Sequence, residues 1–227
     1  MKGVEWPSDR ELSVLRQAAK DIRFLLARGY ARNSAITFVG NHYQLNRLHR
    51  NLLFRAVFPR DTCLRRRRKR LRVGNLFEKE VLVDGYNCFI TLESALRGLP
   101  VIRCDDGFVR DISGVFRSFS PSDKTVQAWR LMERVFQNYK PRRLVFFLDA
   151  PYSNSGRFCA RIRSWLCRSG FDGGCVLIKG PEKEIAHDRE VVVTGDSVII
   201  DGSRQVFDLT GHVVSRMLRI RPISLSP

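Results

Sequence analysis

The stretch EVLVDGYNCFITLES, residues 80–94, decides the fold, because it has the pattern of a buried strand that turns directly into a helix. The apolar run Val81–Val83 ends in Asp84, and Gly85 allows the backbone to turn at that point. Asn87 belongs to a residue type that caps helices well, and residues of helical character follow it. A carboxylate at the carboxyl end of a buried strand lies where open α/β sheets bind their ligands.

Beyond this stretch, strand-like and helix-like segments alternate towards the end of the chain. We predict strands at 80–84, 100–104, 143–149, 174–179, 190–194 and 197–200, and helices at 88–97, 124–139, 155–168 and 209–218. The apolar runs VLV, LVFFL and VVV are typical of parallel strands that are covered on both faces. This alternation predicts an α/β domain at residues 80–227, with a three-layer, mostly parallel sheet.

The first part of the chain, residues 1–60, predicts a small helical hairpin domain. Ser8 and Glu11 fit a capping box, Gly29 ends the first helix, and Pro59 stops the second. A hairpin of this size buries too little surface to be stable alone, so we expect it to dock on the rest of the chain or on a partner.

Residues 61–79 predict a basic linker. The run LRRRRKRLR at 64–72 is a block of like charges that repel one another, so we expect a solvated arm rather than a packed segment. Arms of this kind contact nucleic acid, so the expected nucleic-acid-binding residues include Arg65, Arg66, Arg67, Arg68, Lys69 and Arg70.

Composition indicates a polyanionic partner. The 227 residues include 40 Lys and Arg against 23 Asp and Glu, which gives a formal charge of +17, and the planar arginine fork suits phosphate. The sequence contains no phosphate-binding G-x-x-x-x-G-K-[ST] motif and no G-x-G-x-x-G motif after a strand, which argues against a P-loop ATPase and a dinucleotide enzyme. No run approaches the roughly 18 apolar residues of a membrane helix, and a signal-peptide pattern is missing, so we expect a cytoplasmic protein without a membrane partner.

The six cysteines form no C-x-x-C pair and no zinc-ligand spacing with histidine. Most of them lie in apolar runs, so we expect reduced, buried side chains that behave as small apolar residues.

Three aspartates end or follow predicted strands, namely Asp84, Asp149 and Asp196 in VLVDGYN, LVFFLDAP and VVVTGDS. If the strands are parallel neighbours, these side chains meet in one crevice, where their mutual repulsion is relieved by a divalent cation. Mg²⁺ or Mn²⁺ prefers such oxygen ligands, and can activate water and stabilise charge on a phosphoryl oxygen. The alternative is that each aspartate merely caps a helix or a turn.

The strings VLVDGYN, FFLDAP and TGDSVI resemble the PIN-like nucleases, in particular their NYN branch, over residues 80–218. The resemblance implies a PIN-like sheet, ribonuclease activity, and Asp84, Asp149 and Asp196 as catalytic metal ligands, with Asn87 nearby. Many of these nucleases carry a further acid on a helix that the short segment 180–190 leaves little room for. Glu182, Glu184 and Asp188 are the candidates to replace this further acid, and the sequence does not decide among them.

The whole chain also resembles an uncharacterised, mainly archaeal family, whose N-terminal helical part carries a pattern like RGYARNSAITFVGNHYQLNRLHR, residues 28–50. This second resemblance implies an N-terminal helical domain and no particular function.

Further acids are candidates for the same site. Asp105 and Asp106 in CDDGFVRD either help to bind metal or cap the start of a helix. Glu93, on the helix that follows Asp84, faces either the crevice or solvent.

Basic residues outside the linker add candidate nucleic-acid contacts. The second helix presents a polar face that includes Arg32, Arg47 and Arg50, and the predicted helix at 155–168 carries Arg157 and Arg161.

These observations favour a metal-dependent ribonuclease whose partners are RNA, for example tRNA, rRNA or a ribosome. An inert RNA- or ribosome-binding module on the same scaffold is the alternative from another class, because fold does not fix function. A small-molecule phosphohydrolase is a third hypothesis. The sequence also allows a homo-oligomer.

Overall fold

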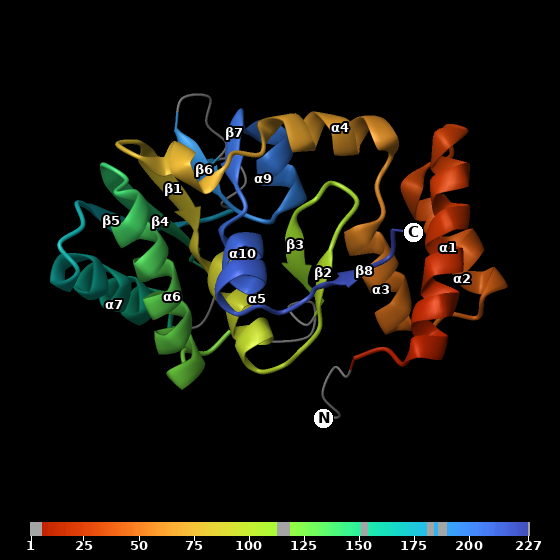
Figure 1. The fold of residues 1–227 in the computed structure, drawn as a ribbon, viewed down its shortest axis with the longest axis horizontal. Coiled ribbons are helices and arrows are strands. Elements are labelled where there is room, and N and C mark those ends of the chain that lie inside the picture. Colours follow the sequence, from red (N-terminus) through yellow and green to blue (C-terminus); the bar gives the residue numbers. More distant parts are fainter. Residues whose placement is uncertain (1–5, 113–118, 151–153, 181–183, 186–189, 227) are drawn as a thin grey trace.

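The structure is a computed structural model that describes residues 6–112, 119–150, 154–180, 184–185 and 190–226. A five-stranded sheet lies at one end of the molecule, the N-terminal helices lie at the other, and a small second sheet lies between them (Figure 1).

The large sheet is entirely parallel, with the strand order β5-β4-β1-β6-β7. Its strands are β1 (Glu80–Asp84), β4 (Arg143–Asp149), β5 (Gly173–Ile178), β6 (Val191–Val193) and β7 (Gln205–Phe207). Their apolar composition arises because both faces of the sheet are covered, as in most parallel sheets.

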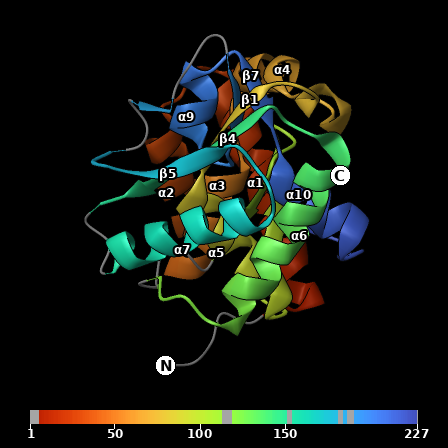
Figure 2. The ribbon, with the colours of Figure 1, turned by 90° about the vertical axis from the view of Figure 1, so that its left-hand side faces the viewer.

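Helices cover this sheet on two sides, so the predicted three-layer α/β fold is confirmed (Figure 2). One face packs on α5 (Gly85–Leu96), α6 (Asp123–Tyr139), α7 (Ser155–Arg168) and α10 (Leu209–His212). The other face packs on the short α9 (Ser197–Gly202), through a smaller cluster that includes Leu82, Val192 and Ile199. Beyond α10 the chain forms a π-helical turn, η3 (Val213–Met217).

Where a hairpin was expected, the described part of residues 1–60 has three helices, α1 (Asp9–Ala27), α2 (Arg32–His42) and α3 (Arg47–Ala56). A fourth, α4 (Arg60–Lys69), lies in the segment predicted as a linker. The expected second helix is interrupted because Gln44 adopts a left-handed φ of 50° and Asn46 caps a new helix, its side chain accepting from the N–H of His49. The capping box of Ser8 and Glu11 at the start of α1 is confirmed.

A three-stranded sheet joins the helices to the rest of the chain. It consists of β2 (Val101–Arg103), β3 (Val109–Asp111) and β8 (Ile223–Ser224), and the first two are antiparallel. Ile102 and Ile223 belong to the same buried core as residues of α1, α2 and α3. The N-terminal helices therefore dock on the remainder of the chain, as expected, and they do so through this second sheet.

The arginine run forms a packed helix, so the expectation of a solvated arm was wrong for part of it. Its residues continue α4 as far as Lys69, and a 3₁₀ turn, η1 (Val73–Leu76), follows. The Arg66 side chain is only 4% exposed and pairs with Asp106 and with Asp201. The repulsion within the run is offset because these distant carboxylates neutralise Arg66, which the local sequence does not reveal.

The expectation of reduced cysteines was wrong for one pair, because a disulfide joins Cys159 of α7 to Cys175 of β5. Cys63, Cys88 and Cys104 are free and buried, as expected. Among the described residues, none of the helices is both long and apolar enough to cross a bilayer.

Candidate functional site

The three strand-end aspartates lie at the same edge of the large sheet. Asp84 of β1 is paired with Phe147 of β4, so Asp149 lies two residues further along the neighbouring strand. On the other side, Val83 is paired with Val193, so Asp196 follows in the loop two residues beyond the level of Asp84. Ideal strand spacings put the Cα atoms of Asp84 and Asp149 about 8 Å apart.

Asp84 is held by both flanking segments. Asp84 is the N-cap of α5, because its carboxylate accepts from the N–H of Asn87, and it also accepts from the hydroxyl of Thr194 after β6 at 2.8 Å. Asn87, the residue that the sequence indicated as a cap, lies inside the first turn of the helix instead. Gly85 follows because α5 starts hard against β4: a Cβ there would lie 2.6 Å from a methyl group of Leu148. The aspartate is buried, with Oδ1 held by α5 and Oδ2 held by Thr194.

Asp196 organises that loop as the N-cap of α9. Its Oδ1 accepts from the N–H groups of Val198 at 2.8 Å and Ile199 at 3.2 Å. The strand predicted at 197–200 was therefore wrong, because this cap starts a short helix in a segment whose β-branched residues favour a strand. The Asn87 side chain accepts from the N–H of Gly195 at 2.8 Å, which ties the loop to α5.

Asp149 ends β4 and accepts from the N–H of Gly180 at 3.4 Å. Over the described ranges, no three His, Cys, Asp or Glu side chains form a group that could hold a metal ion. Of the three possible substitutes for the further acid, Glu184 is exposed, whereas Glu182 and Asp188 lie outside the described residues.

A cavity of about 330 Å³, here called the edge pocket, opens beside Asp196 between the sheet edge and the N-terminal helices. Its lining includes Arg32, Phe54, Phe58, Asn87, Arg110 and Asp196. It thus brings arginine side chains and one of the strand-end carboxylates to a common space.

An ion-pair network adjoins the edge pocket, because Arg110 belongs to both. Asp106 is fully buried and binds Arg110 through both oxygens, at 2.9 and 2.8 Å, while Arg66 adds a third contact at 2.9 Å. Burial alone would raise the pKa of the Asp106 carboxyl, but Arg110 and then Arg66 hold it below its usual value. Nε of Arg110 donates to the carbonyl of Gly195, so the network also fixes the loop before Asp196.

The two acids of the sequence CDDGFVRD therefore do not start a helix, and that interpretation was wrong. Both lie in the turn between β2 and β3. Asp105 forms a two-pronged pair with Arg23 of α1, at 2.9 and 2.7 Å, which helps to dock the N-terminal helices. The carboxylate of Asp106 is occupied by arginine nitrogens instead of pointing into open space.

Glu93 lies away from the sheet edge, in the packing between α5 and α6. It is buried, accepts from the hydroxyl of Thr125, and pairs with Arg97 one turn later. This carboxylate supports the contact between two helices.

The candidate nucleic-acid contacts divide into exposed and structural arginines. Arg50 is structural, because it donates to the carbonyls of Leu45 and Thr37 and packs against Gly40. Residue Arg66 is buried, and Lys69 donates to the carbonyls of Ile200 and Asp201. The exposed members are Arg47, Arg65, Arg67, Arg68, Arg70, Arg157 and Arg161.

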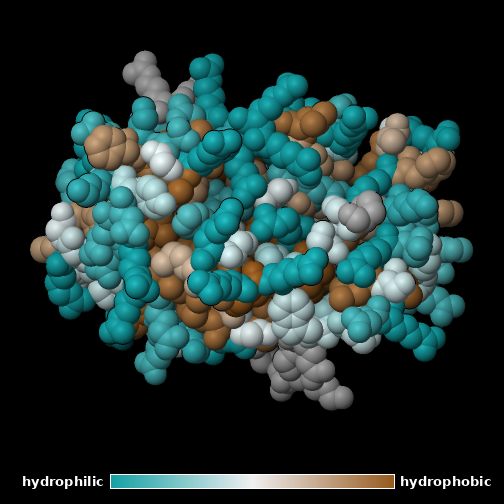
Figure 3. All heavy atoms as spheres, in the orientation of Figure 1, coloured by the Kyte–Doolittle hydropathy of each residue, from teal (hydrophilic) through white to brown (hydrophobic). Residues whose placement is uncertain are grey.

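A second and larger cavity, about 880 Å³ and here called the basic groove, lies between the end of α4 and α10. Its lining includes Arg67, Arg70, Arg72, Arg103, His212 and Arg216. Mostly hydrophilic residues cover this part of the surface (Figure 3). Burial raises the pKa of the Asp208 carboxyl in its wall and lowers the pKa of His212.

Sequence reasoning missed Arg110 and Thr194, and it also missed Arg55, which lines the edge pocket. Thr194 is the last residue of the strand predicted at 190–194, level with Asp84, and a comparison of strand ends would have found it. Arg110 has no such local signal, because its partners come from a turn and a loop far apart in the chain.

Two family models match separate parts of the chain. Residues 14–69 match a family described as a protein of unknown function, DUF434. An uncharacterized protein of Methanocaldococcus jannaschii, MJ0935, is 29% identical over 202 residues, which span 88% of this chain and 96% of the relative. No solved structure matches. Residues 73–212, more than half of the chain, match the family described as domain of unknown function DUF5616, and the chain belongs to that family.

Proposed function

We propose that the protein is a metal-dependent ribonuclease that hydrolyses RNA phosphodiesters, with Asp84, Asp149 and Asp196 as its catalytic carboxylates. The observation that carries the proposal is their position at the carboxyl ends of three neighbouring parallel segments, with the central one, Asp84, flanked by the other two. This edge is the general ligand-binding position of open α/β sheets.

The donor set suits a hard cation. Asp84 and Asp196 carry carboxylates, the ligand type that Mg²⁺ and Mn²⁺ prefer. The neighbouring side-chain oxygens of Asn87 and Thr194 are of a suitable type too, although they already accept from the N–H groups of Gly195 and Asp196. Such an ion, when bound, supplies Lewis-acid stabilisation of charge on a phosphoryl oxygen. The residues of the chain hold the carboxylates in place: Thr194 and the N–H of Asn87 fix Asp84, and the start of α9 fixes Asp196.

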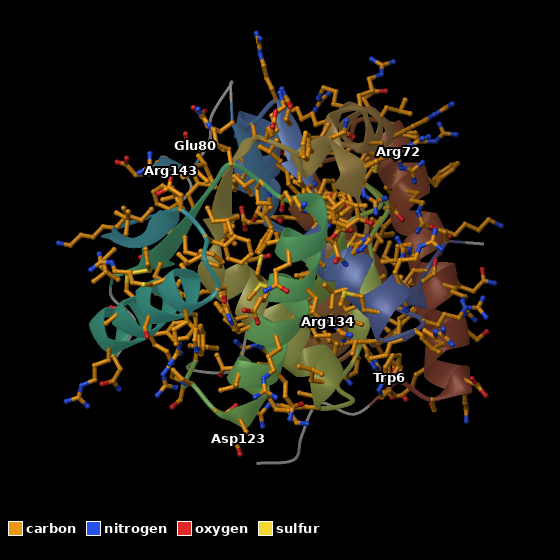
Figure 4. All side chains as sticks on the ribbon, turned by 60° about the vertical axis from the view of Figure 1, so that its left-hand side comes forward. Trp6, Arg72, Glu80, Asp123, Arg134 and Arg143 are labelled. Carbon is orange, nitrogen blue, oxygen red and sulfur yellow. A yellow bond between two sulfur atoms is a disulfide. The ribbon has the colours of Figure 1, made fainter. Side chains whose placement is uncertain are left out.

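RNA suits the electrostatics of the molecule. The net charge is +17, and nitrogen-tipped side chains extend from most sides of the ribbon, Arg72 and Arg143 among them (Figure 4). The basic groove concentrates five arginines in one cavity. Such surfaces bind phosphate backbones with an affinity that falls steeply with salt, and the proposed substrates, tRNA or rRNA, place the protein in the cytoplasm.

A second candidate function is an RNA- or ribosome-binding module without catalysis. It is favoured by one observation: in the part of the chain that the structure describes, no three acidic, histidine or cysteine side chains are grouped closely enough for a metal. Binding would then depend on the basic groove, and the aspartates would serve as caps for α5 and α9.

Cleavage assays separate the two candidates. Structured and single-stranded RNA are incubated with Mn²⁺ and either the wild-type protein, the Asp84→Asn variant or an Asp172→Asn control, whose side chain is 75% exposed. The nuclease proposal expects cleavage by the wild type and the control and none by Asp84→Asn. Cleavage by all three proteins, or by none, rejects it.

A binding assay completes the comparison. If RNA binding survives Asp84→Asn but is lost when Arg67, Arg70 and Arg72 are changed to Gln, and no protein cleaves, the binding module is favoured. These three arginines are chosen because they line the basic groove, whereas Arg66 is buried in the ion-pair network.

A further inference from the structure

The edge pocket contains an arginine whose surroundings are unusual. Arg32, at the start of α2, lies between two aromatic rings, with its guanidinium carbon 4.3 Å from the ring centre of Phe54 and 4.1 Å from that of Phe58. Aromatic contacts on the guanidinium faces leave the donors around its edge as the groups that can bind an acceptor.

One of those edge donors has an acceptor and another has none. Nε of Arg32 donates to the carbonyl of Val57 at 2.9 Å, whereas Nη2 is buried and has no hydrogen-bond partner among the described residues. A buried charged donor without an acceptor is costly, and native structures rarely keep one without a reason. The free donor therefore points to an acceptor other than the described residues, and a bound ligand is one that the pocket can admit.

The charges around Arg32 specify an anion. Burial, together with repulsion from Arg66 and Arg110, lowers the pKa of Arg32 to about 10, so the side chain is still charged at neutral pH. The guanidinium carbons of Arg66 and Arg110 lie 4.4 and 5.3 Å from the same Phe58 ring. Their charges are partly neutralised by Asp106, while Arg32 has a hydrogen bond to a neutral carbonyl.

Shape and position narrow the anion to a phosphate. The planar fork of arginine matches the oxygens of phosphate groups, and the 330 Å³ cavity has room for more than that group. A neighbouring hollow of about 230 Å³ shares Asn51 and Phe54 with the edge pocket, so a chain of nucleotides can continue past the phosphate. Asp196 in the same lining places the phosphate beside the proposed catalytic edge.

We propose that the edge pocket is a phosphate-binding subsite, in which Arg32, assisted by Arg110 and Arg55, binds a backbone phosphate of the RNA strand next to the strand-end aspartates. This assignment rests on the proposed function for its choice of RNA. It gives the N-terminal helices a role in substrate binding, because Arg32, Phe54 and Phe58 all come from that region or its end.

The test measures phosphate binding without metal or cleavage. Inorganic phosphate is titrated into the full chain by calorimetry, at an ionic strength held constant with chloride, for the wild type and for Arg32→Gln and Arg32→Lys. We expect saturable binding to the wild type and affinity at least about tenfold weaker in both variants, because lysine keeps the charge but loses the planar fork. Arg32→Lys also provides a folded variant should the loss of the charge prevent folding of Arg32→Gln.

A matched control is Arg28→Gln, since Arg28 also stacks on an aromatic ring, Phe24, at 4.3 Å but lies outside the edge pocket. Binding that is unchanged in both Arg32 variants, equally weakened in Arg28→Gln, or absent from the wild type overturns the proposal. A single-stranded oligouridylate of six nucleotides is then added as a competitor. Displacement of phosphate supports RNA as the source, and failure to displace it overturns that assignment.

Failure of this proposal is distinguishable from failure of the proposed function. If Arg32 proves irrelevant to phosphate but cleavage still depends on Asp84, the ribonuclease proposal stands and the subsite falls. If phosphate binding depends on Arg32 while no protein cleaves RNA, the subsite stands on the alternative binding module.

Discussion

Two groups of aspartates in this molecule have the same chemistry and opposite surroundings. In the turn between β2 and β3, Asp105 and Asp106 are held by arginine side chains from α1, α4 and β3. At the edge of the large sheet, the contacts described for Asp149 and Asp196 come from backbone N–H groups of the segments that follow them. The turn aspartates are paired with charged groups of the chain itself, whereas the hydrogen bonds described for the edge aspartates come from uncharged N–H and O–H donors.

The difference teaches how a basic chain separates its structural acids from its candidate catalytic acids. A carboxylate that is enclosed by guanidinium groups already has its charge neutralised and its lone pairs occupied, so it stabilises the fold. A carboxylate that accepts hydrogen bonds only from uncharged N–H or O–H donors retains its negative charge, which can attract a cation. We therefore expect substitutions in the turn to affect stability and substitutions at the edge to affect chemistry.

The largest expected effect is on stability, from Asp106→Asn. This change leaves Arg110 and Arg66 in the interior without their shared carboxylate, and breaking a buried pair costs about 3–5 kcal/mol. The free energy of unfolding, measured by urea denaturation, should fall by about that amount.

The control for this measurement is Asp172→Asn, whose carboxylate is 75% exposed and lies 3.9 Å from Arg143. Its effect should stay within about 0.5 kcal/mol. If Asp106→Asn is no more destabilising than this control, the turn aspartates do not have the structural role assigned to them.

The next largest effect is expected on RNA cleavage, from Asp196→Asn. Removing one charged ligand forfeits several kcal/mol of charge stabilisation, so cleavage in Mn²⁺ should fall by at least about 100-fold. Because the amide oxygen can still cap α9, the unfolding free energy should change by about 1 kcal/mol or less. Asp105→Asn is the matched variant from the turn, and it should reduce stability while leaving cleavage within about threefold of the wild type. If Asp105→Asn abolished cleavage and Asp196→Asn did not, the division into structural turn aspartates and catalytic edge aspartates would be wrong.

The fold was largely predictable because its signals are local. The runs at 80–84 and 143–149 are apolar enough to specify strands of a parallel sheet, and the observed β1 and β4 have those bounds. The helix at 155–168 was likewise predicted with its bounds, since its apolar periodicity lies within the segment. The strands β3, β7 and β8 were missed because each has only two or three residues and includes a polar one, whereas the equally short β6 is the apolar run VVV.

The site was predictable only in part, for a related reason. The common edge of Asp84, Asp149 and Asp196 follows from parallel strand order, which sequence alternation indicates. The edge pocket does not follow, because it depends on where α2 and α3 dock, and the docking is decided by pairs such as Arg23 with Asp105, 82 residues apart. The same limit explains Arg66, which is part of a like-charge block in sequence and part of a buried ion pair in space.

Acid should weaken the ion pairs of Asp106 with Arg110 and Arg66 within a defined range of pH. Although burial opposes it, the charges of Arg110 and Arg66 leave the pKa of Asp106 below its ordinary value of 3.8. A lowered pKa adds stability that is fully present above the ordinary value and is lost as the pH falls through the lowered one. The urea concentration at the unfolding midpoint of the wild type should therefore decrease once the pH is below about 4. Asp208 contributes with the opposite sign, since burial raises its pKa. If the Asp106→Asn variant shows the same drop as the wild type, the loss arises elsewhere.

The smallest effect is expected from Asp201→Asn. This variant tests whether the contribution of a carboxylate to stability is set by its burial or by the number of its contacts to Arg66. Asp201 binds the same Arg66 as Asp106, through two contacts of 2.8 and 2.7 Å, but its side chain is 49% exposed whereas that of Asp106 is fully buried. Water can replace most of what the exposed carboxylate provides, and Arg66 retains Asp106, so the unfolding free energy should fall by only about 1 kcal/mol. A loss as large as that of Asp106→Asn would show that the number of contacts to Arg66, and not their burial, sets the stability of the network.

Because Asp201 lies on α9, next to the loop of Asp196, RNA cleavage by this variant should be measured in parallel. Unchanged cleavage is expected, since the cap that Asp196 makes to Val198 and Ile199 remains.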